Sequence, residues 1–262
     1  MSNLKKHGEK FNPILETNMF SKEECDKIKS LLLKKQNKWE NRSPEGNFFM
    51  SYGALTYLDA KTGVAEDPEY DKFRNNDKSI PDIYSKKADY FNNMMIKDFE
   101  WMYARIWSYY QPKFDKPVVF EKALPGFHIF QTAEQLNHDY VKNLATIHVD
   151  LPQTSHDWDV ISASSFTIAV ELPECGAGLN IWRDDSIFKS VNTVFYHQMS
   201  KDEQKIVNKT AEYFPYKLGY VYEQSGFTRH QITCGGNVMS GERRITVQGH
   251  LVEVSDKIII YV

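Results

Sequence analysis

The stretch Thr146-Ile147-His148-Val149-Asp150-Leu151 decides how this sequence is interpreted, because apolar and polar residues alternate along it. In a β-strand, successive side chains point to opposite faces. His148 and Asp150 are therefore predicted to share one face, while the apolar residues pack on the other. An imidazole and a carboxylate two residues apart can both reach one ion, and together they suit a divalent metal such as iron(II).

A second histidine, His230, is predicted to complete this metal site. It lies in a short predicted strand, 229–233, which follows a turn after another predicted strand, 219–224. The resulting hairpin would carry His230 to the same face as His148 and Asp150. Two histidines and one carboxylate on one side of an octahedral ion leave the opposite side open, and such a facial triad is typical of non-haem iron oxygenases.

The stretch Glu242-Arg243-Arg244-Ile245-Thr246-Val247-Gln248 predicts a binding site for an anion. If the isoleucine and the valine pack outward, then Arg244 and Thr246 point inward. A guanidinium can hold a carboxylate in a planar two-point contact, and a hydroxyl two residues on adds a donor. Because a buried arginine without an anion is costly, we expect a negatively charged small molecule beside the metal. A β-bulge in this strand would exchange the directions of Arg243 and Arg244.

The second half of the sequence predicts strand after strand, without long helices between them. Gly, Pro, Asn or Asp stands between most of these strands, as is typical of turns. Many short strands in this arrangement favour a barrel or a sandwich. The predicted strands are 127–131, 145–151, 165–172, 179–183, 219–224, 229–233 and 243–254.

The first half of the sequence predicts a mostly helical layer. Ser21 and Glu24 have the spacing of a capping box at the start of a helix. Apolar residues recur at three- and four-residue steps over about 86–110, which predicts a longer helix with one buried face. A strand pair is predicted between these helices, over 47–59.

Length and composition limit the class of protein. The chain has 262 residues, of which 41% are hydrophobic, so it can bury a sizeable core and is too apolar for a disordered protein. We expect one domain of the α+β class, 1–262, in which an N-terminal helical layer (1–115) packs on a mainly β core (116–262).

The charges and the cysteines indicate a protein that acts on a small molecule in a reducing compartment. The 32 Lys and Arg residues nearly balance the 35 Asp and Glu residues, so no strong field would attract nucleic acid or a membrane. No apolar run is long enough to span a bilayer, and the N-terminus has no apolar signal core. The three cysteines are far apart and odd in number, which does not indicate a disulfide framework. We therefore expect a cytoplasmic protein, and no feature indicates its oligomeric state.

The pattern His148-x-Asp150, His230 and Arg244-x-Thr246 resembles that of the iron(II)/2-oxoglutarate-dependent oxygenase superfamily. The resemblance implies a double-stranded β-helix, or jelly roll, with the N-terminal helices packed on it. It implies that the first three residues hold iron(II) and that Arg244 and Thr246 bind the distal carboxylate of 2-oxoglutarate. It further implies that the enzyme uses dioxygen to hydroxylate a substrate while 2-oxoglutarate is decarboxylated to succinate.

Two further expectations concern the reaction and the substrate. Related halogenating enzymes have a small residue in place of the carboxylate, so Asp150 implies hydroxylation, or desaturation, over halogenation. The substrate is expected to be a small molecule such as an amino acid or a natural-product intermediate. His128, Asn180 and Trp182 are candidate substrate contacts on the predicted strands, although packing and hydrogen bonding within the barrel are the simpler role for them.

Three other functions agree with the same residues. A protein or peptide hydroxylase of this superfamily would need an open groove for its substrate. A non-enzymatic metal-binding jelly roll would explain the metal ligands, but not the arginine and the hydroxyl. A zinc-dependent hydrolase or isomerase on the same scaffold would differ in its metal.

Overall fold

The structure is a computed structural model, and its described residues cover most of the two halves recognised in the sequence. The description begins at Ile14 and reaches the C-terminal Val262. The described residues are 14–42, 49–54, 80–131, 136, 143, 145–150, 158–183, 186, 188, 198–225 and 228–262.

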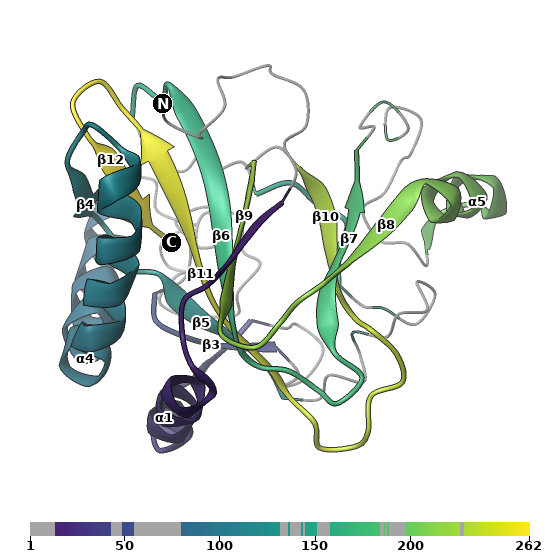
Figure 1. The fold of residues 1–262 in the computed structure, drawn as a ribbon, viewed down its shortest axis with the longest axis horizontal. Helices are drawn as coiled ribbons and strands as arrows, with labels where there is room; N and C mark the ends of the chain where they lie inside the picture. Colours follow the sequence, from purple (N-terminus) through teal and green to yellow (C-terminus); the bar gives the residue numbers. More distant parts are fainter. Residues whose placement is uncertain are drawn as a thin grey trace.

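The chain is mainly β-structure, with two long helices contributed by the first half (Figure 1). The elements in chain order are β1 (Leu15–Asn18), α1 (Lys22–Leu33), η1 (Gln36–Lys38), β2 (Glu40–Asn41), β3 (Phe49–Tyr52), α4 (Ile80–Tyr110), η2 (Gln111–Lys113), β4 (Val118–Phe120), β5 (Gly126–Phe130), β6 (Ser162–Glu171), β7 (Ala177–Trp182), α5 (Lys201–Thr210), β8 (Ala211–Pro215), β9 (Tyr220–Ser225), β10 (Arg229–Cys234), β11 (Arg244–Glu253) and β12 (Ile258–Tyr261).

Two sheets carry the fold. Among the described residues, the large sheet has the strand order β1-β9-β6-β11-β5-β3-β2; β12 also pairs with β11, and β4 pairs with β12. The small sheet has the order β10-β7-β8. All the pairings are antiparallel except that of β12 with β4. The mainly β core predicted from the sequence is therefore confirmed.

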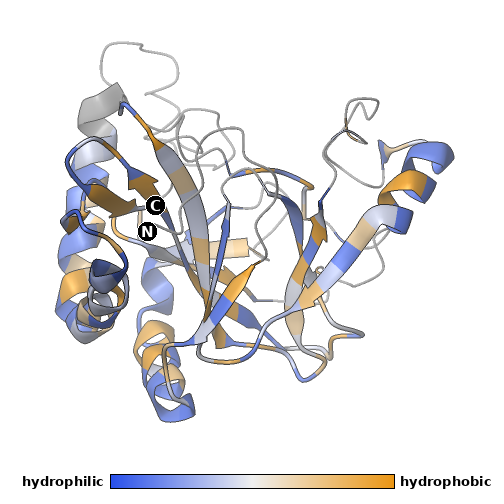
Figure 2. Ribbon diagram, turned by 45° about the horizontal axis from the view of Figure 1, so that its top comes forward, coloured by the Kyte–Doolittle hydropathy of each residue, from blue (hydrophilic) through white to orange (hydrophobic). Residues whose placement is uncertain are grey.

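The large sheet has an apolar outer face that packs against α1 and α4. Phe127 of β5, Phe166 of β6 and Val247 of β11 form one buried cluster with apolar residues of the two helices. Figure 2 shows the alternation of hydrophobic and hydrophilic residues along these elements. The opposite, inner face contributes to a second buried cluster, in which Phe130 of β5 joins Ile232 of β10 in the small sheet. The inner face of the large sheet therefore turns toward the small sheet.

The N-terminal helices begin where the sequence predicts, or earlier. Ser21 caps α1, and its capping box with Glu24 is formed. The helix predicted over 86–110 begins earlier, at Ile80, and its backbone departs from helical geometry at Phe99. Its predicted apolar stripe is buried.

Strands from the N-terminal half also extend the large sheet, which the sequence did not indicate. β1 pairs with β9, and β3 pairs with β5. Within the strand pair predicted over 47–59, the structure has β3, which pairs with β2; residues 47–48 and 55–59 lie outside the described residues. The helical layer and the β core thus share one sheet.

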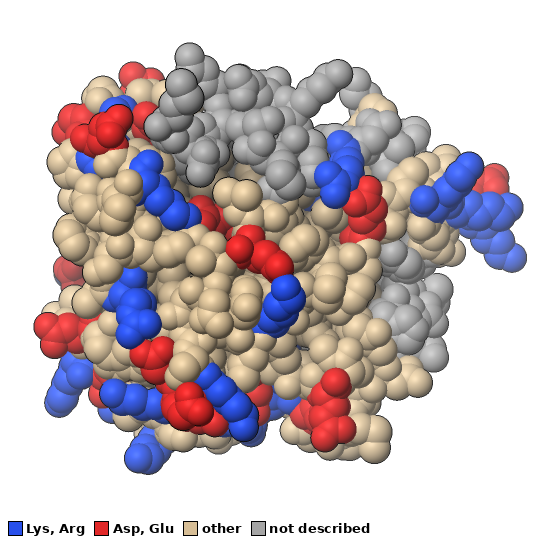
Figure 3. Space-filling model, in the orientation of Figure 1, with Lys and Arg blue, Asp and Glu red and all other residues tan. Residues whose placement is uncertain are grey.

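Three further observations concern the surface and the cysteines. No helix among the described residues is long and apolar enough to cross a membrane. On the face shown in Figure 3, basic and acidic side chains are interspersed. Cys25, Cys175 and Cys234 are all free thiols, so the chain has no disulfide, as the sequence predicts.

Candidate functional site

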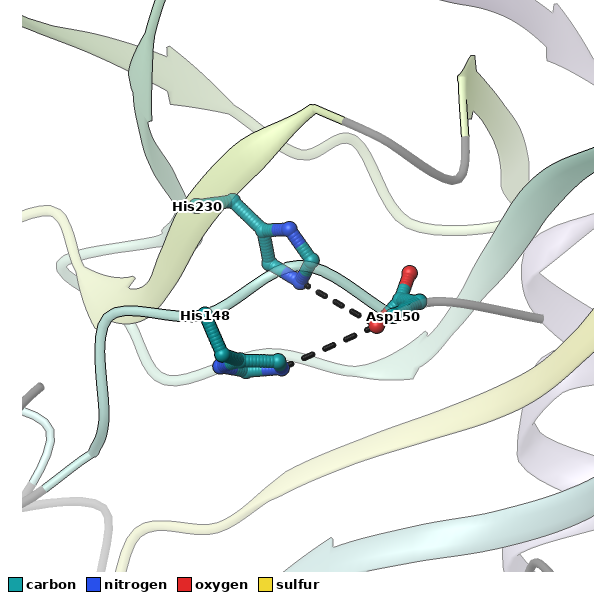
Figure 4. A group of neighbouring side chains, drawn as sticks. All are labelled: His148, Asp150 and His230. Atoms are coloured by element: carbon teal, nitrogen blue, oxygen red, sulfur yellow. Dashed lines mark ion pairs between the residues drawn. The ribbon is translucent and has the colours of Figure 1, made fainter. Parts of the chain in front are cut away.

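Three of the predicted residues meet at one point on the inner side of the fold (Figure 4). Nε2 of His148 lies 3.7 Å from Oδ1 of Asp150, and Nε2 of His230 lies 3.6 Å from the same oxygen. One ligand atom from each of the three residues lies within 4.8 Å of the others. β10 supplies His230, while the segment 145–150 supplies the other two.

The segment that carries His148 and Asp150 is not the regular strand predicted over 145–151. His148 forms a single antiparallel bridge with His230, through two backbone hydrogen bonds of 2.9 Å. The neighbouring backbone carbonyls interact with side chains instead of a paired strand. The carbonyl oxygen of Ala145 accepts from the Gln231 side chain, and the carbonyl oxygen of Thr146 interacts with the His148 ring. A single bridge therefore stands in place of the predicted strand pairing, yet it still brings His148 and His230 together.

Backbone carbonyls orient both histidine rings toward the carboxylate. Nδ1 of His148 lies 3.1 Å from the carbonyl oxygen of Thr146, and Nδ1 of His230 lies 2.9 Å from that of Thr228. A carbonyl oxygen only accepts, so each Nδ1 carries a proton. The two Nε2 atoms and a carboxylate oxygen thus face one another, as the ligand atoms of a metal ion do.

The charge states fit the same conclusion. Burial, followed by the neighbouring His230, lowers the pKa of His148 to about 4, so its ring is neutral near pH 7. Burial raises the pKa of the Asp150 carboxyl, but His230, His250 and His148 and a hydrogen bond from Ser165 bring it below its usual range. A neutral imidazole and an ionised carboxylate are the forms that bind a metal.

The spacing of the donor atoms suits one ion. An octahedral ion about 2.1 Å from each donor separates neighbouring donors by about 3.0 Å and opposite donors by about 4.2 Å. The distances from Asp150 to the two imidazoles, 3.6 and 3.7 Å, lie between these values. Two imidazoles and one carboxylate could therefore hold a divalent metal such as iron(II).

Arg244 and Thr246 lie on the inner face of β11, as the alternation predicts. Both side chains are fully buried. All three guanidinium nitrogens of Arg244 and the hydroxyl of Thr246 lack a hydrogen-bond partner among the described residues. The rings of Phe130 and Tyr216 flank the guanidinium at 5.5 and 5.6 Å, and burial lowers its pKa. Since unpaired buried donors of this kind are costly, the two residues could form a site for an anionic ligand.

Arg243, the neighbouring arginine, has a different environment. Its Nε lies 3.2 Å from a carboxylate oxygen of Glu171, and its side chain is partly exposed. A register shift between β11 and β6 occurs only after Ile245, so it does not exchange the two arginines. The structure thus shows that Arg244, and not Arg243, points to the inner face, as strand alternation without a bulge at the two arginines predicts.

The predicted substrate contacts have different positions. His128 lies on the inner face, because it pairs with Thr246 across β5 and β11. Asn180 and Trp182 lie on the face of the small sheet opposite to His230, since His230 pairs with Ile181. Asn180 donates to Gln231 there, and the Trp182 indole donates to a carbonyl of α5. We therefore do not include these two residues in the proposed site.

Two polar residues near Asp150 were not predicted as part of the site. Oγ of Ser165, on β6, lies 3.0 Å from Nδ1 of His250, on β11, and both groups contribute to the low pKa of Asp150. His250 has the same strand parity as Arg244, which places it on the inner face. That parity was the available sequence signal, while the position of Ser165 depends on the pairing of β6 with β11.

Comparison with solved structures identifies the fold. The chain matches the N-substituted L-amino acid dioxygenase from Burkholderia ambifaria AMMD with a TM-score of 0.51 and 8% identity, over 95% of this chain and 86% of that one. The same enzyme in complex with alpha-KG, which is 2-oxoglutarate, matches with a TM-score of 0.52 and 10% identity over the same shares of the two chains. The chain has the fold of this dioxygenase. This likeness agrees, at the level of the fold alone, with the resemblance noted in the sequence. No protein-family model and no curated protein matches the sequence.

Proposed function

We propose that this protein is an iron(II)/2-oxoglutarate-dependent oxygenase built on a double-stranded β-helix within one domain, and that it hydroxylates a small molecule in the cytoplasm. The observation that supports it most is the combination of a metal-ligand set with a buried, unpartnered arginine on the same inner face. The ligand set alone suits many metal proteins. The arginine adds the need for an anion, which a cosubstrate dicarboxylate meets.

Each residue has a definite part in this proposal. His148, Asp150 and His230 hold the iron, with both imidazoles oriented by backbone carbonyls. Arg244 and Thr246 bind the distal carboxylate of 2-oxoglutarate. When bound, iron and 2-oxoglutarate supply an oxidant from dioxygen: one oxygen atom enters the substrate as a hydroxyl group, and the other enters succinate as carbon dioxide is released.

The substrate class is proposed from the fold and from the surface. The dioxygenase of the same fold is named for N-substituted L-amino acids. The mixed charge seen on one face of this protein does not indicate a nucleic-acid partner (Figure 3). An amino acid or a natural-product intermediate is the proposed substrate.

The test is 2-oxoglutarate-dependent formation of succinate, measured with a panel of amino acids and metabolites under iron(II) and dioxygen. We expect turnover by the wild-type protein and none above background by the variants His148→Ala and Asp150→Ala. Asp159→Ala is a matched control, because Asp159 is an exposed acidic residue outside the proposed site. Equal turnover by Asp150→Ala and Asp159→Ala would refute the assigned metal ligands.

A further inference from the structure

His128 lies directly beside the two residues proposed to bind the carboxylate. In the pairing of β5 with β11, His128 is opposite Thr246, and Phe130 is opposite Arg244. Residues that are opposite each other in an antiparallel pair share a face, with Cβ atoms about 5 Å apart. The imidazole of His128 therefore belongs to the same inner surface as the unpartnered hydroxyl and guanidinium.

The proton position on His128 follows from its contact with Arg42. Nη1 of Arg42 lies 2.7 Å from Nε2 of His128. A guanidinium has donors and no acceptor, so Nε2 must accept and the proton of the neutral ring must be on Nδ1. Burial, followed by the charges of Arg42 and Arg244, holds the pKa of His128 well below its usual value, in agreement with a neutral ring.

The strand order determines which way this Nδ1–H points. The Arg42 guanidinium lies 4.8 Å from the ring of Phe49, on β3. In the sheet, β3 and β11 are on opposite sides of β5. The two nitrogens of an imidazole point in nearly opposite directions, so when Nε2 faces the side of β3, Nδ1 faces the side of β11. The Nδ1–H is thus directed toward Thr246 and Arg244.

The Nδ1–H of His128, like the donors of Thr246 and Arg244, has no hydrogen-bond acceptor in the described part of the chain. Nδ1 of His128 is buried and has no hydrogen-bond partner among the described residues, like the hydroxyl of Thr246 and the guanidinium of Arg244. An unpaired buried N–H is costly, and one acceptor group between these neighbouring residues could satisfy all three donors. A carboxylate has two oxygens and about four acceptor positions, which is enough for all three.

We propose that His128 is a further ligand of the cosubstrate, donating through Nδ1–H to the carboxylate held by Arg244 and Thr246, and that Arg42 is a positioning residue that fixes its tautomer. This inference rests on the proposed function. In this proposal, residues of two strands, β5 and β11, form the carboxylate site, and Arg42, in the segment that follows β2, holds His128 in place.

Two substitutions at His128 separate the donor from the support. His128→Asn places an amide near the position of Nδ1, so it keeps a donor toward β11 and loses the contact with Arg42. His128→Gln places its amide near the position of Nε2, so it keeps an acceptor for Arg42 and loses the donor. The affinity of the iron(II)-loaded protein for 2-oxoglutarate is measured by calorimetry without dioxygen. We expect His128→Gln to bind about tenfold more weakly, and His128→Asn to remain within about threefold of wild type.

The controls distinguish this inference from the proposed function. If the wild-type protein does not bind 2-oxoglutarate, the proposed function fails and the inference fails with it. If wild type binds it, Arg244→Met loses it, and His128→Gln binds as tightly as wild type, then the function stands and the inference is wrong. Equal weakening in His128→Asn and His128→Gln also overturns it, because the donor position would then be irrelevant. The iron(II) affinity is expected to be unchanged in both His128 variants.

A spectroscopic measurement needs no substitution at His128. In the zinc-loaded, diamagnetic protein, nitrogen-15 NMR of the imidazoles distinguishes an Nδ1–H ring from an Nε2–H ring. We expect His128 as the Nδ1–H tautomer, and a mixture of both tautomers in Arg42→Met. An Nε2–H signal for His128 in the wild-type protein would contradict the proposal.

Discussion

At the start of β11, from Arg244 to Val247, both faces of the strand are buried but they have opposite chemistry. On the outer face, Ile245, Val247 and Leu251 are apolar and pack against the helical layer. On the inner face, Arg244 and Thr246 are polar, and their side chains have no hydrogen-bond partner among the described residues. Burial of apolar surface stabilises a fold, whereas burial of unpaired donors destabilises it. The outer face therefore supports the fold, and under the proposed function the inner face binds a ligand at the expense of stability.

The sharpest test of this comparison replaces the inner arginine by an apolar residue. Arg244→Met removes a buried charge and keeps a similar volume, so the free energy of unfolding is expected to stay the same or to rise by about 1–4 kcal/mol. Binding of 2-oxoglutarate should weaken at least about a hundredfold, because two charge-assisted hydrogen bonds of roughly 1.5–3 kcal/mol each are lost. Denaturant unfolding and calorimetry measure the two effects. A destabilised variant with unchanged affinity would show that Arg244 is structural.

The outer face should respond in the opposite way. Ile245→Ala leaves a cavity in the core, so the free energy of unfolding is expected to fall by about 2–5 kcal/mol. Its side chain points away from the ligand, so the folded variant should bind 2-oxoglutarate as wild type does. Unfolding in urea and calorimetry below the transition check both statements. A loss of affinity larger than about threefold in the folded variant would mean that the two faces are not independent.

The contrast of faces could be predicted from the sequence, since it depends only on alternation along a strand. The same rule placed His148 with Asp150 and Arg244 with Thr246 on common faces. The rule also gave the right result where the predicted secondary structure was wrong. The segment 145–150 forms a single bridge instead of a strand, yet His148 and Asp150 still lie close together. Short-range parity is set by the backbone itself, which explains why it was predictable.

Contacts between distant strands could not be obtained in this way. Arg42 reaches His128 only because β2, β3 and β5 are neighbours in the sheet, and strand order is not written in local periodicity. The helix α5 was also missed, although Ser200 and Glu203 form a capping box at its start and their spacing was a usable signal. Asn180 and Trp182 were candidate substrate contacts because they share one face of a predicted strand, but pairing with β10 places them on the face opposite to His230.

Metal removal tests the part of the inner face that involves His148, Asp150 and His230. An ion that binds only the folded protein stabilises it by about 2.7 kcal/mol at a concentration one hundred times its Kd. We therefore expect a higher melting temperature with iron(II) or manganese(II) than with a chelator, measured anaerobically. Asp150→Ala should abolish this difference, while Asp159→Ala should retain it. An equal shift in both variants would place the stabilising ion elsewhere.

A smaller effect is expected for the hydroxyl on the inner face. Thr246→Val has nearly the same shape and removes one donor to the carboxylate, which corresponds to about 1.5 kcal/mol, or about tenfold in the Kd for 2-oxoglutarate. Since the hydroxyl has no partner among the described residues, its loss should not lower the free energy of unfolding. Thr246→Ser, which keeps the hydroxyl, should bind 2-oxoglutarate nearly as wild type does; if it binds as weakly as the valine variant, the hydroxyl is not a donor to the ligand.

The smallest effect is expected at Arg243, which differs from Arg244 in position by one residue. Its guanidinium pairs with Glu171 and is partly exposed, so Arg243→Met should change the free energy of unfolding by no more than about 1 kcal/mol. The same substitution at Arg244 removes the proposed carboxylate ligand, so the two variants form a matched pair with opposite readouts. Calorimetry with 2-oxoglutarate should give the wild-type Kd for Arg243→Met. If Arg243→Met were the variant that lost binding, the anion site would belong to the outer side of β11, and the division of labour between its two faces would be wrong.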